Sequence, residues 1–281
     1  AADLDISAED QQRVLESLGL DRPLHLQYLS WFGGVLRGDL GTSLLSGRPV
    51  ANLIGQALPA SILLAATALG LAVLVSVPLG IVSAIRRYSV LDYGVTLFSF
   101  FGASIPGFWY AILLILVFGV LLGWLPTSGI RPAGSDPTPL DTVRHLLLPS
   151  IVLSTAAMAQ LTRYTRSSVI EVLRKDYMRT ARAKGVHERR VILRHGLRNA
   201  LFPVVTVVGL LIPVLLGGAA VVELVFAWPG IGRLAIDAAL RRDYPIVMGV
   251  TLLISTVTVV SNLVIDVIYL LLDPRLQGEG A

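Results

Sequence analysis

The residues best suited to binding chemistry form one cationic stretch between residues 173 and 199. Small residues at 181, 183 and 185 stand among its basic side chains, which are Arg174, Lys175, Arg179, Arg182, Lys184, Arg189, Arg190, Arg194 and Arg198. Cations at this density attract anionic groups such as lipid headgroups, and small residues let a partner's surface approach the backbone closely. The stretch is therefore a candidate for docking rather than for bond-breaking chemistry.

The rest of the sequence offers no residue set typical of an enzyme. The chain lacks the phosphate-binding pattern G-x-x-x-x-G-K-[ST] and the zinc-protease pattern H-E-x-x-H, and its 4 histidines stand far apart. It contains no cysteine, which excludes disulfides and thiolate metal sites. We predict that the chain is not an enzyme, binds no metal and holds no cofactor of its own.

Composition places the chain in a membrane. Of its 281 residues 54% are hydrophobic and only 15% are charged, too few to cover the surface of a soluble domain. The mean hydropathy is +0.73. The net charge of +4 could suggest a nucleic-acid partner, but a basic balance in a membrane protein usually reflects cytoplasmic loops, so no nucleic acid is expected.

Five apolar runs are long enough to cross the bilayer, which needs about 20 helical residues. They are residues 59–85, 92–122, 146–172, 200–226 and 246–272. The second would reach about 46 Å as a continuous helix, so we predict one tilted helix kinked near Pro106 and Gly107. The expected fold class is an all-α polytopic membrane protein with five spans in this chain.

Positive charge sets the expected orientation. The cationic 173–199 loop and the pair Arg86 and Arg87 fall on one side if five spans alternate, and that side is predicted to be cytoplasmic. The C-terminal tail, 274–281, is then cytoplasmic, and residues 1–57 form an extracytoplasmic segment. Apolar stripes predict short amphipathic helices within 7–19 and 26–38, resting on the lipid bilayer. The transmembrane domain is expected to span 58–273.

The exported segment raises a question of topology. Nothing in front of residues 1–57 resembles a signal peptide or anchor. We expect an upstream transmembrane helix in the natural protein, which would then have six spans.

The cationic loop itself is predicted to be helix, turn, helix. No residue from 171 to 184 breaks a helix, Gly185 interrupts it, and residues 187–198 are again compatible with a helix until Pro203. Retention of positive charge on the cytoplasmic side would explain the cations alone. It would not explain two helical pieces punctuated by glycine.

The stretch DYMRTARAKGVHERRVILRHGLRNALFPVVT resembles the cytoplasmic loop of ABC importer permeases of the dipeptide, oligopeptide and nickel family. In that family the loop carries a Glu-Ala-Ala motif followed by glycine, and it forms a coupling helix that enters a groove of the ATPase subunit. Aligned on Gly185, the motif positions fall on Arg179, Thr180 and Ala181. Further resemblances follow in order along the chain, among them LGLDRPLHLQYLSWFGG, SIPGFWYAILLILVF, ELVFAWPGIGRLAIDAALRRDYPIVMG and DVIYLLLDPRL.

This resemblance implies a type I ABC importer transmembrane domain in the cell (inner) membrane, with ATP and magnesium bound by partners. The implied partners are two ABC ATPase subunits, a second and different permease, and an extracytoplasmic substrate-binding protein. The chain would form half of the translocation pathway for dipeptides and oligopeptides. The implied ATPase-coupling residues are Tyr177, Thr180, Ala181, Ala183, Lys184, Gly185, Val186, His187 and Glu188.

Two further hypotheses concern the pathway. Ser104, Pro106, Gly107 and Phe108 are candidate lining residues, because a Pro-Gly break frees backbone groups that must face protein or water. The alternative function is an ion-coupled secondary transporter, which needs ionisable groups near the bilayer midplane. Asp266 in the last span is the main candidate, and an interhelical hydrogen bond or ion pair is its expected role.

Overall fold

The chain folds into an elongated bundle of helices. The computed structural model describes residues 21–131 and 138–272, and the predicted amphipathic helix within 7–19 and the tail 274–281 lie outside them. Within the described ranges no β-strand forms, and one isolated bridge joins Thr42 to Pro49. The predicted all-α class is confirmed.

Four helices are long and apolar enough to cross a membrane. The number of candidate spans rises to five if a pair of shorter helices with a bend between them is taken as one span. The first three long helices in chain order are α3 (Val50–Ile85), α6 (Pro139–Leu173) and α9 (Arg198–Val225), and the last is α11 (Tyr244–Leu272). α3 begins nine positions before the predicted residue 59, and α6 begins seven before residue 146, because each helix continues past the apolar run. The domain limits drawn from those runs stay predictions.

The second span differs from the prediction. It consists of α4 (Val90–Ser104) and a second helical stretch over Gly107–Leu121, which begins with α5 (Gly107–Leu114), and the two stretches are bent by 104°. The single tilted helix with a kink is therefore wrong. The reason is local: Ile105 and Pro106 both adopt extended backbone, with ψ of 124° and 127°, so they end one helix before the next begins. A π-helical segment, η1 (Ile115–Leu121), continues α5.

Helix α6 forms the centre of the bundle. In its most apolar 18-residue window 67% of the residues are buried, against 22%, 28% and 17% in the corresponding windows of the α3, α9 and α11 spans. α3, α4 and α9 all pack on α6, and α3 does so most extensively. Its start is fixed by Thr138 and Asp141, whose side chains each bond the other's backbone amide, with Pro139 at the first helical position.

Small side chains let α3 and α6 approach closely. A Cβ atom added to Gly80 would lie 2.7 Å from the Thr165 Cβ and 2.9 Å from the Thr162 carbonyl oxygen, so no larger residue fits there without a shift. Ser76 of α3 donates a hydrogen bond to the carbonyl oxygen of Met158 at 3.1 Å. Close contact between small residues is a common way for helices to associate in lipid.

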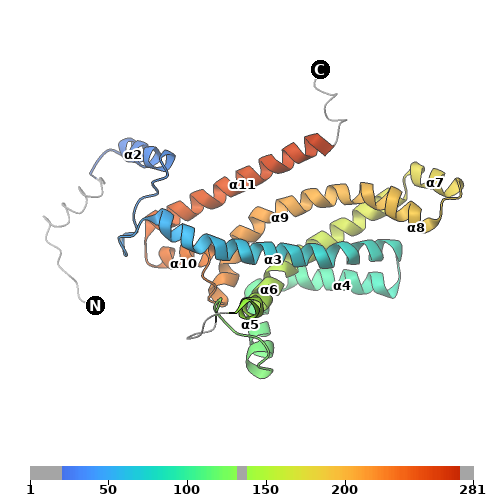
Figure 1. The fold of residues 1–281 in the computed structure, drawn as a ribbon, viewed down its shortest axis with the longest axis horizontal. Helices are drawn as coiled ribbons and strands as arrows, with labels where there is room; N and C mark the ends of the chain where they lie inside the picture. The colour runs from blue at the N-terminus through green and yellow to red at the C-terminus, as the bar shows by residue number, and fades with distance from the viewer. Residues whose placement is uncertain (1–20, 132–137, 273–281) are drawn as a thin grey trace, which may run out of the picture.

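The two ends of the molecule carry different elements. Short helices α7 (Asp176–Ala183) and α8 (Glu188–Arg190) lie at one end, as does the turn from α3 to α4 (Figure 1). The opposite end carries α2 (Leu24–Leu36) and α10 (Ile231–Leu240) (Figure 1). α2 falls where the second amphipathic helix is predicted, and none of its residues is buried. The cationic loop is thus confined to one end of the bundle.

Candidate coupling site

The cationic loop folds as two helical pieces joined by a tight turn. α7 ends at Ala183, and Gly185 has a φ of +76°, which glycine adopts readily and other residues do not. The amide of Gly185 donates to the carbonyl of Arg182 at 2.9 Å, and the amide of Val186 donates to that of Ala181 at 3.3 Å. These two bonds form a Schellman motif. The predicted helix end at Gly185 is confirmed.

A small core of its own holds the loop together. Met178, Ala181 and Val191 are buried against one another, and Leu173 from the end of α6 packs on them. Gly196 completes the contact, since a Cβ there would lie 3.2 Å from the Met178 Cε. Ala181 is therefore an interior residue of the loop. The Ala181 side chain, which the sequence suggested would face a partner, is covered by the loop itself.

Ion pairs stabilise the outer side of the turn. Arg182 donates to both carboxylate oxygens of Glu188, with Nη2 to Oε1 at 3.0 Å and Nε to Oε2 at 3.2 Å. His187 caps α8, because its Nδ1 accepts a hydrogen bond from the amide of Arg189 at 3.3 Å. Lys175 lies 2.9 Å from Glu171, whose hydrogen bond raises the pKa of Lys175 above its ordinary value.

Most of the residues implied in coupling share an accessible surface. Half-buried Val186 and buried Ala181 anchor it, and the exposed members are Tyr177, Thr180, Ala183, Lys184, Gly185, His187 and Glu188. We call this exposed set the coupling surface. The Tyr177 hydroxyl accepts a hydrogen bond from Asn199 Nδ2 at 3.2 Å, which links α7 to the start of α9.

The sequence missed two local features of the loop. α6 ends at Leu173 and α7 begins at Asp176, so the predicted continuous helix over 171–184 is wrong. Lys175 has a ψ of 149°, and Asp176 in the first turn of α7 suits the helix N-terminus. The second predicted helix contains a π-helical segment, η2 (Val191–Leu197), which leads directly into α9. Residues 173–176 include no helix breaker, whereas η2 contains Gly196, a weak helix former that is a local signal of irregularity.

The four candidate pathway residues lie together at the bend between α4 and α5. Ser104 ends α4, Pro106 is extended, and Gly107 begins α5. Phe108 follows on α5 with 53% of its surface exposed. The structure thus brings these residues together at one exposed corner.

Three buried carboxyl groups form polar sites that the sequence did not indicate. Asp92 is paired with Arg166, and Asp243 accepts from the Ser43 hydroxyl at 2.5 Å. Glu223 is fully buried and accepts from the Ser61 hydroxyl at 2.6 Å. These partners lie 74, 200 and 162 positions apart, so no local pattern could have found them.

The Glu223 site fixes the turn before α10. Its Oε2 accepts from the amide of Arg233 at 3.0 Å, while the Ser61 hydroxyl oxygen accepts from the amide of Ile231 at 2.8 Å. Trp228 is fully buried and donates from Nε1 to the carbonyl of Ala60 at 2.9 Å. The carboxyl group thus satisfies backbone amides at the α10 N-terminus.

The role expected for Asp266 stays a prediction. This residue is exposed on α11, and the described part of the chain gives it neither a hydrogen bond nor an ion pair. The same part brings together no group of three or more His, Cys, Asp or Glu side chains that could hold a metal ion.

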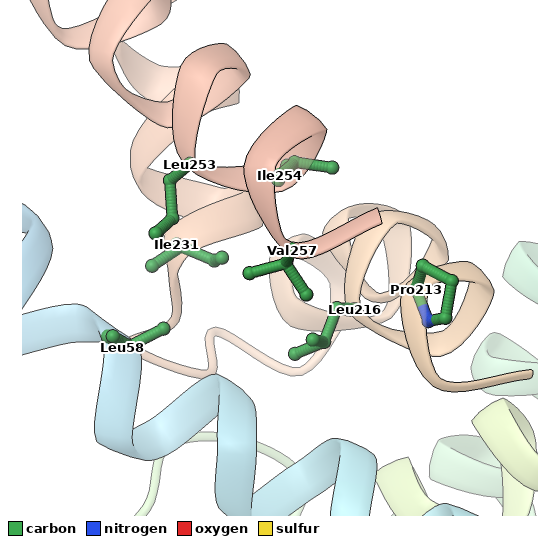
Figure 2. Close-up of a pocket in the computed structure, with 7 residues that line it drawn as sticks. All are labelled: Leu58, Pro213, Leu216, Ile231, Leu253, Ile254 and Val257. Carbon is green, nitrogen blue, oxygen red and sulfur yellow. The ribbon is translucent and has the colours of Figure 1, made fainter. Parts of the chain in front are cut away.

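The bundle contains several cavities, and two of those beside α10 are lined partly by charged side chains such as Asp237 and Arg241. One between α3, α9, α10 and α11 has a volume of about 10 Å³, room for about one water molecule. Figure 2 shows the side chains that line it, Leu58, Pro213, Leu216, Ile231, Leu253, Ile254 and Val257. None is charged, and a space of this size cannot hold a transported solute.

Comparison with known proteins gives the family. Residues 76–278, more than half of the chain, match the family described as "Binding-protein-dependent transport system inner membrane component". The chain is 48% identical over 273 residues to the oligopeptide transport system permease protein AppB of Bacillus subtilis, covering 97% of this chain and 86% of that protein. It is 41% identical over 300 residues to the dipeptide transport system permease protein DppB of Escherichia coli, covering 99% and 88%.

Solved structures share the fold. A chain of an amino acid ABC transporter superposes with a TM-score of 0.58 at 14% identity, over 77% of this chain and 92% of that one. A chain of the MetNI methionine ABC transporter in an inward-facing conformation gives 0.57 at 14% identity, over 76% and 95%. The ion-coupled alternative finds no support among these relatives. The chain belongs to the family of inner membrane components of binding-protein-dependent transport systems.

Proposed function

We propose that this chain is one of two permeases in an ATP-driven importer and that the coupling surface docks on an ATPase subunit. In this complex two ABC ATPases bind ATP and magnesium, a second and different permease completes the pathway, and an extracytoplasmic binding protein delivers substrate. The observation that carries the proposal is the compact α7–α8 unit, which has its own core and lies at the end of the bundle.

The packing of this unit is suited to transmitting a displacement of α7 to the long helices. Its core joins Met178 and Ala181 to Leu173 of α6 and to Val191, where η2 leads into α9. A push on α7 therefore reaches both long helices as a rigid-body displacement rather than being absorbed by a flexible loop. The exposed cations and the small residue Ala183 provide the outward surface.

Orientation follows from the same placement. If the coupling surface faces the cytoplasm, α2 and α10 at the opposite end face the outside, as does the remainder of residues 1–57. The turn that carries Arg86 and Arg87 lies at the α7 end (Figure 1), which agrees with the positive-inside rule. The tail 274–281 is then cytoplasmic.

The substrate we propose is a dipeptide or a short oligopeptide. This proposal rests on the relatives, whose names state oligopeptide or dipeptide transport and whose identity to this chain is 48% and 41%. The corner formed by Ser104, Pro106, Gly107 and Phe108 would line part of the route, since its interrupted backbone must face protein or water.

The test is to replace Ala183 with tryptophan in the tagged complex and to measure ATPase co-purification by quantitative mass spectrometry. A bulky side chain on the exposed end of α7 should block the docking contact and lower ATPase recovery on the order of tenfold, as expected when a central interface position is disrupted. Uptake of a labelled dipeptide into vesicles should fall in parallel.

Ala239→Trp is the matched control, because Ala239 is an exposed alanine in the last turn of α10 at the other end of the molecule. It should leave ATPase recovery unchanged. Equal ATPase recovery with Ala183→Trp and with the control would refute the docking assignment. ATPases recovered with a wild-type complex that imports no peptide would refute the substrate alone.

A further inference from the structure

A buried ion pair joins α4 to α6 near the α7 end of the bundle. Arg166 donates from Nε to Asp92 Oδ1 at 2.7 Å and from Nη2 to Oδ2 at 2.8 Å, a bidentate arrangement. The Asp92 side chain is 4% exposed and that of Arg166 is 30% exposed. Paired charges inside apolar helices are costly to build and commonly mark function.

The carboxylate of Asp92 is also bonded by the turn that precedes its helix. Oδ2 accepts from the amide of Tyr88 at 2.9 Å, and Oδ1 accepts from the Ser83 hydroxyl of α3. The amide of Asp92 donates to Ser89 Oγ at 3.2 Å, which caps α4. One carboxylate therefore fixes the end of α3, the turn and the start of α4 to a single arginine of α6.

Stability alone does not require such a pair. Apolar side chains of similar volume usually hold buried helices together at least as well as an ion pair does. A bidentate pair differs in being directional, because planar guanidinium and carboxylate groups bond well in only one alignment. The pair therefore fixes the register of α4 on α6.

A second contact fixes the far end of α4. A Cβ on Gly102 would lie 3.2 Å from both the Thr155 Cγ2 and the Thr155 carbonyl oxygen, so the two helices touch there. The separation of Asp92 from Gly102 is about 15 Å along α4, and that of Arg166 from Thr155 is about 16.5 Å along α6. The two contacts match in spacing on antiparallel helices, so α4 is held at both ends.

The position of the pair connects the coupling surface to the bend. Arg166 lies about 10 Å, or two helical turns, before Leu173, the α6 residue that packs in the core of the coupling loop. At the other end of α4, Ile105 and Pro106 form the two-residue break before α5. If α6 is displaced and α4 moves with it, the displacement reaches the break at Ile105 and Pro106.

We propose that the Asp92–Arg166 pair is a positioning element that locks α4 to α6, so that a displacement of α7 is transmitted to the bend at Ile105 and Pro106. α4 and α6 then move as one body, and the angle to α5 changes. This inference rests on the proposed coupling function. Neither residue contacts the transported solute in this role.

The experiment uses the assembled complex in proteoliposomes and compares Asp92→Asn with wild type. The amide keeps the volume of the side chain but removes the charge that aligns Arg166. Peptide import per ATP hydrolysed should fall on the order of tenfold while ATP hydrolysis continues, which is the scale of mutations that alter coupling between sites. Asp237→Asn is the control, because the Arg233–Asp237 pair on α10 is exposed and lies 3.7 Å apart.

A distance measurement separates positioning from mere stability. The chain has no cysteine, so Tyr93→Cys on α4 and Tyr164→Cys on α6, both exposed, accept spin labels at defined positions. In the otherwise wild-type chain the distance between the labels should be the same with and without trapped ATP. In the Asp92→Asn chain the distribution should broaden or shift when ATP binds.

Three results would overturn the proposal: unchanged import per ATP in Asp92→Asn, a label distance that changes with ATP in the wild-type pair, or identical distributions in both chains. If Asp92→Asn does not accumulate, Arg166→Lys, which keeps the charge but loses the bidentate geometry, replaces it. Failure of the wild-type complex to import peptide would refute the proposed substrate, and failure to recover ATPases with it would refute the proposed function, whereas the label distances would still test whether α4 is held on α6.

Discussion

Replacing Ser61 with alanine should loosen the attachment of the α10 turn to α3. The Ser61 hydroxyl donates to Glu223 Oε1 at 2.6 Å and accepts from the amide of Ile231 at 2.8 Å. All three residues are almost completely buried, so water cannot replace the missing hydroxyl. The substitution therefore leaves one carboxyl oxygen and one amide without these partners.

The expected magnitude follows from those two groups. Each buried polar group left unsatisfied costs about 1–3 kcal/mol, which gives about 2–6 kcal/mol in total. Relaxation within a membrane protein reduces such penalties, so we expect the lower end, about 2 kcal/mol. For a chain of this size that corresponds to a fall in Tm of roughly 4–8 °C.

The assay is thermal unfolding of the purified protein in mild detergent, followed by the loss of monodisperse protein. Ser99→Ala is the matched control, because Ser99 is also a buried serine in a spanning helix. Among residues 21–131 and 138–272 its hydroxyl bonds only the carbonyl of Val95, four positions earlier in the same helix, at 2.9 Å. Its loss should change the unfolding free energy by less than about 1 kcal/mol.

Equal shifts for the two alanine variants would refute the reasoning. They would mean that the Ser61 hydroxyl contributes no more to the free energy of unfolding than a hydrogen bond within one helix does. A Ser61→Thr variant, which keeps a hydroxyl, should recover more of the stability than Ser61→Ala.

Two further predictions test helix packing and loop attachment. Gly80→Ala should destabilise the protein by about 1–3 kcal/mol in thermal unfolding, because the added Cβ would meet Thr165. Gly70→Ala is the control and should be neutral or stabilising, because a Cβ added there has no atom within 4 Å. Equal effects would contradict the α3–α6 contact. Asp243→Ala removes the acceptor of the Ser43 hydroxyl and should free the loop over residues 39–49, so that proteolysis within this loop becomes faster. An unchanged rate of cleavage would show that the Asp243 carboxylate does not hold this loop.

Much of the fold could be predicted, because a long apolar run in a bilayer is expected to form a helix. Each run must satisfy its backbone internally, so it forms a helix, and its length and flanking charges set its limits. The bend between α4 and α5 could not be predicted to be 104°, since Pro106 and Gly107 permit a mild kink as well as a full break. Packing of both helices on α6 selects between them.

The cationic loop likewise has one feature that the sequence predicts and one that only the structure decides. The helix end at Gly185 was predictable, because a glycine after a helical run favours the left-handed conformation at that position. The interior placement of Ala181 was not, because the pattern of small residues does not say whether a methyl group meets a partner or the Met178 side chain. Only the folding of η2 back onto α7 decides it.

The sequence by itself determined that this protein is a helical membrane protein, which stretches form its four long helices and which loop is cationic. These properties depend on local composition and on contiguous length, which the order of residues records directly. The tertiary structure alone decided which buried carboxyl groups meet which partners, at Asp92, Glu223 and Asp243. The partner positions lie far apart along the chain, so their pairing exists only once α4 has packed on α6, α3 on α9, and the segment before α3 against the turn after α10.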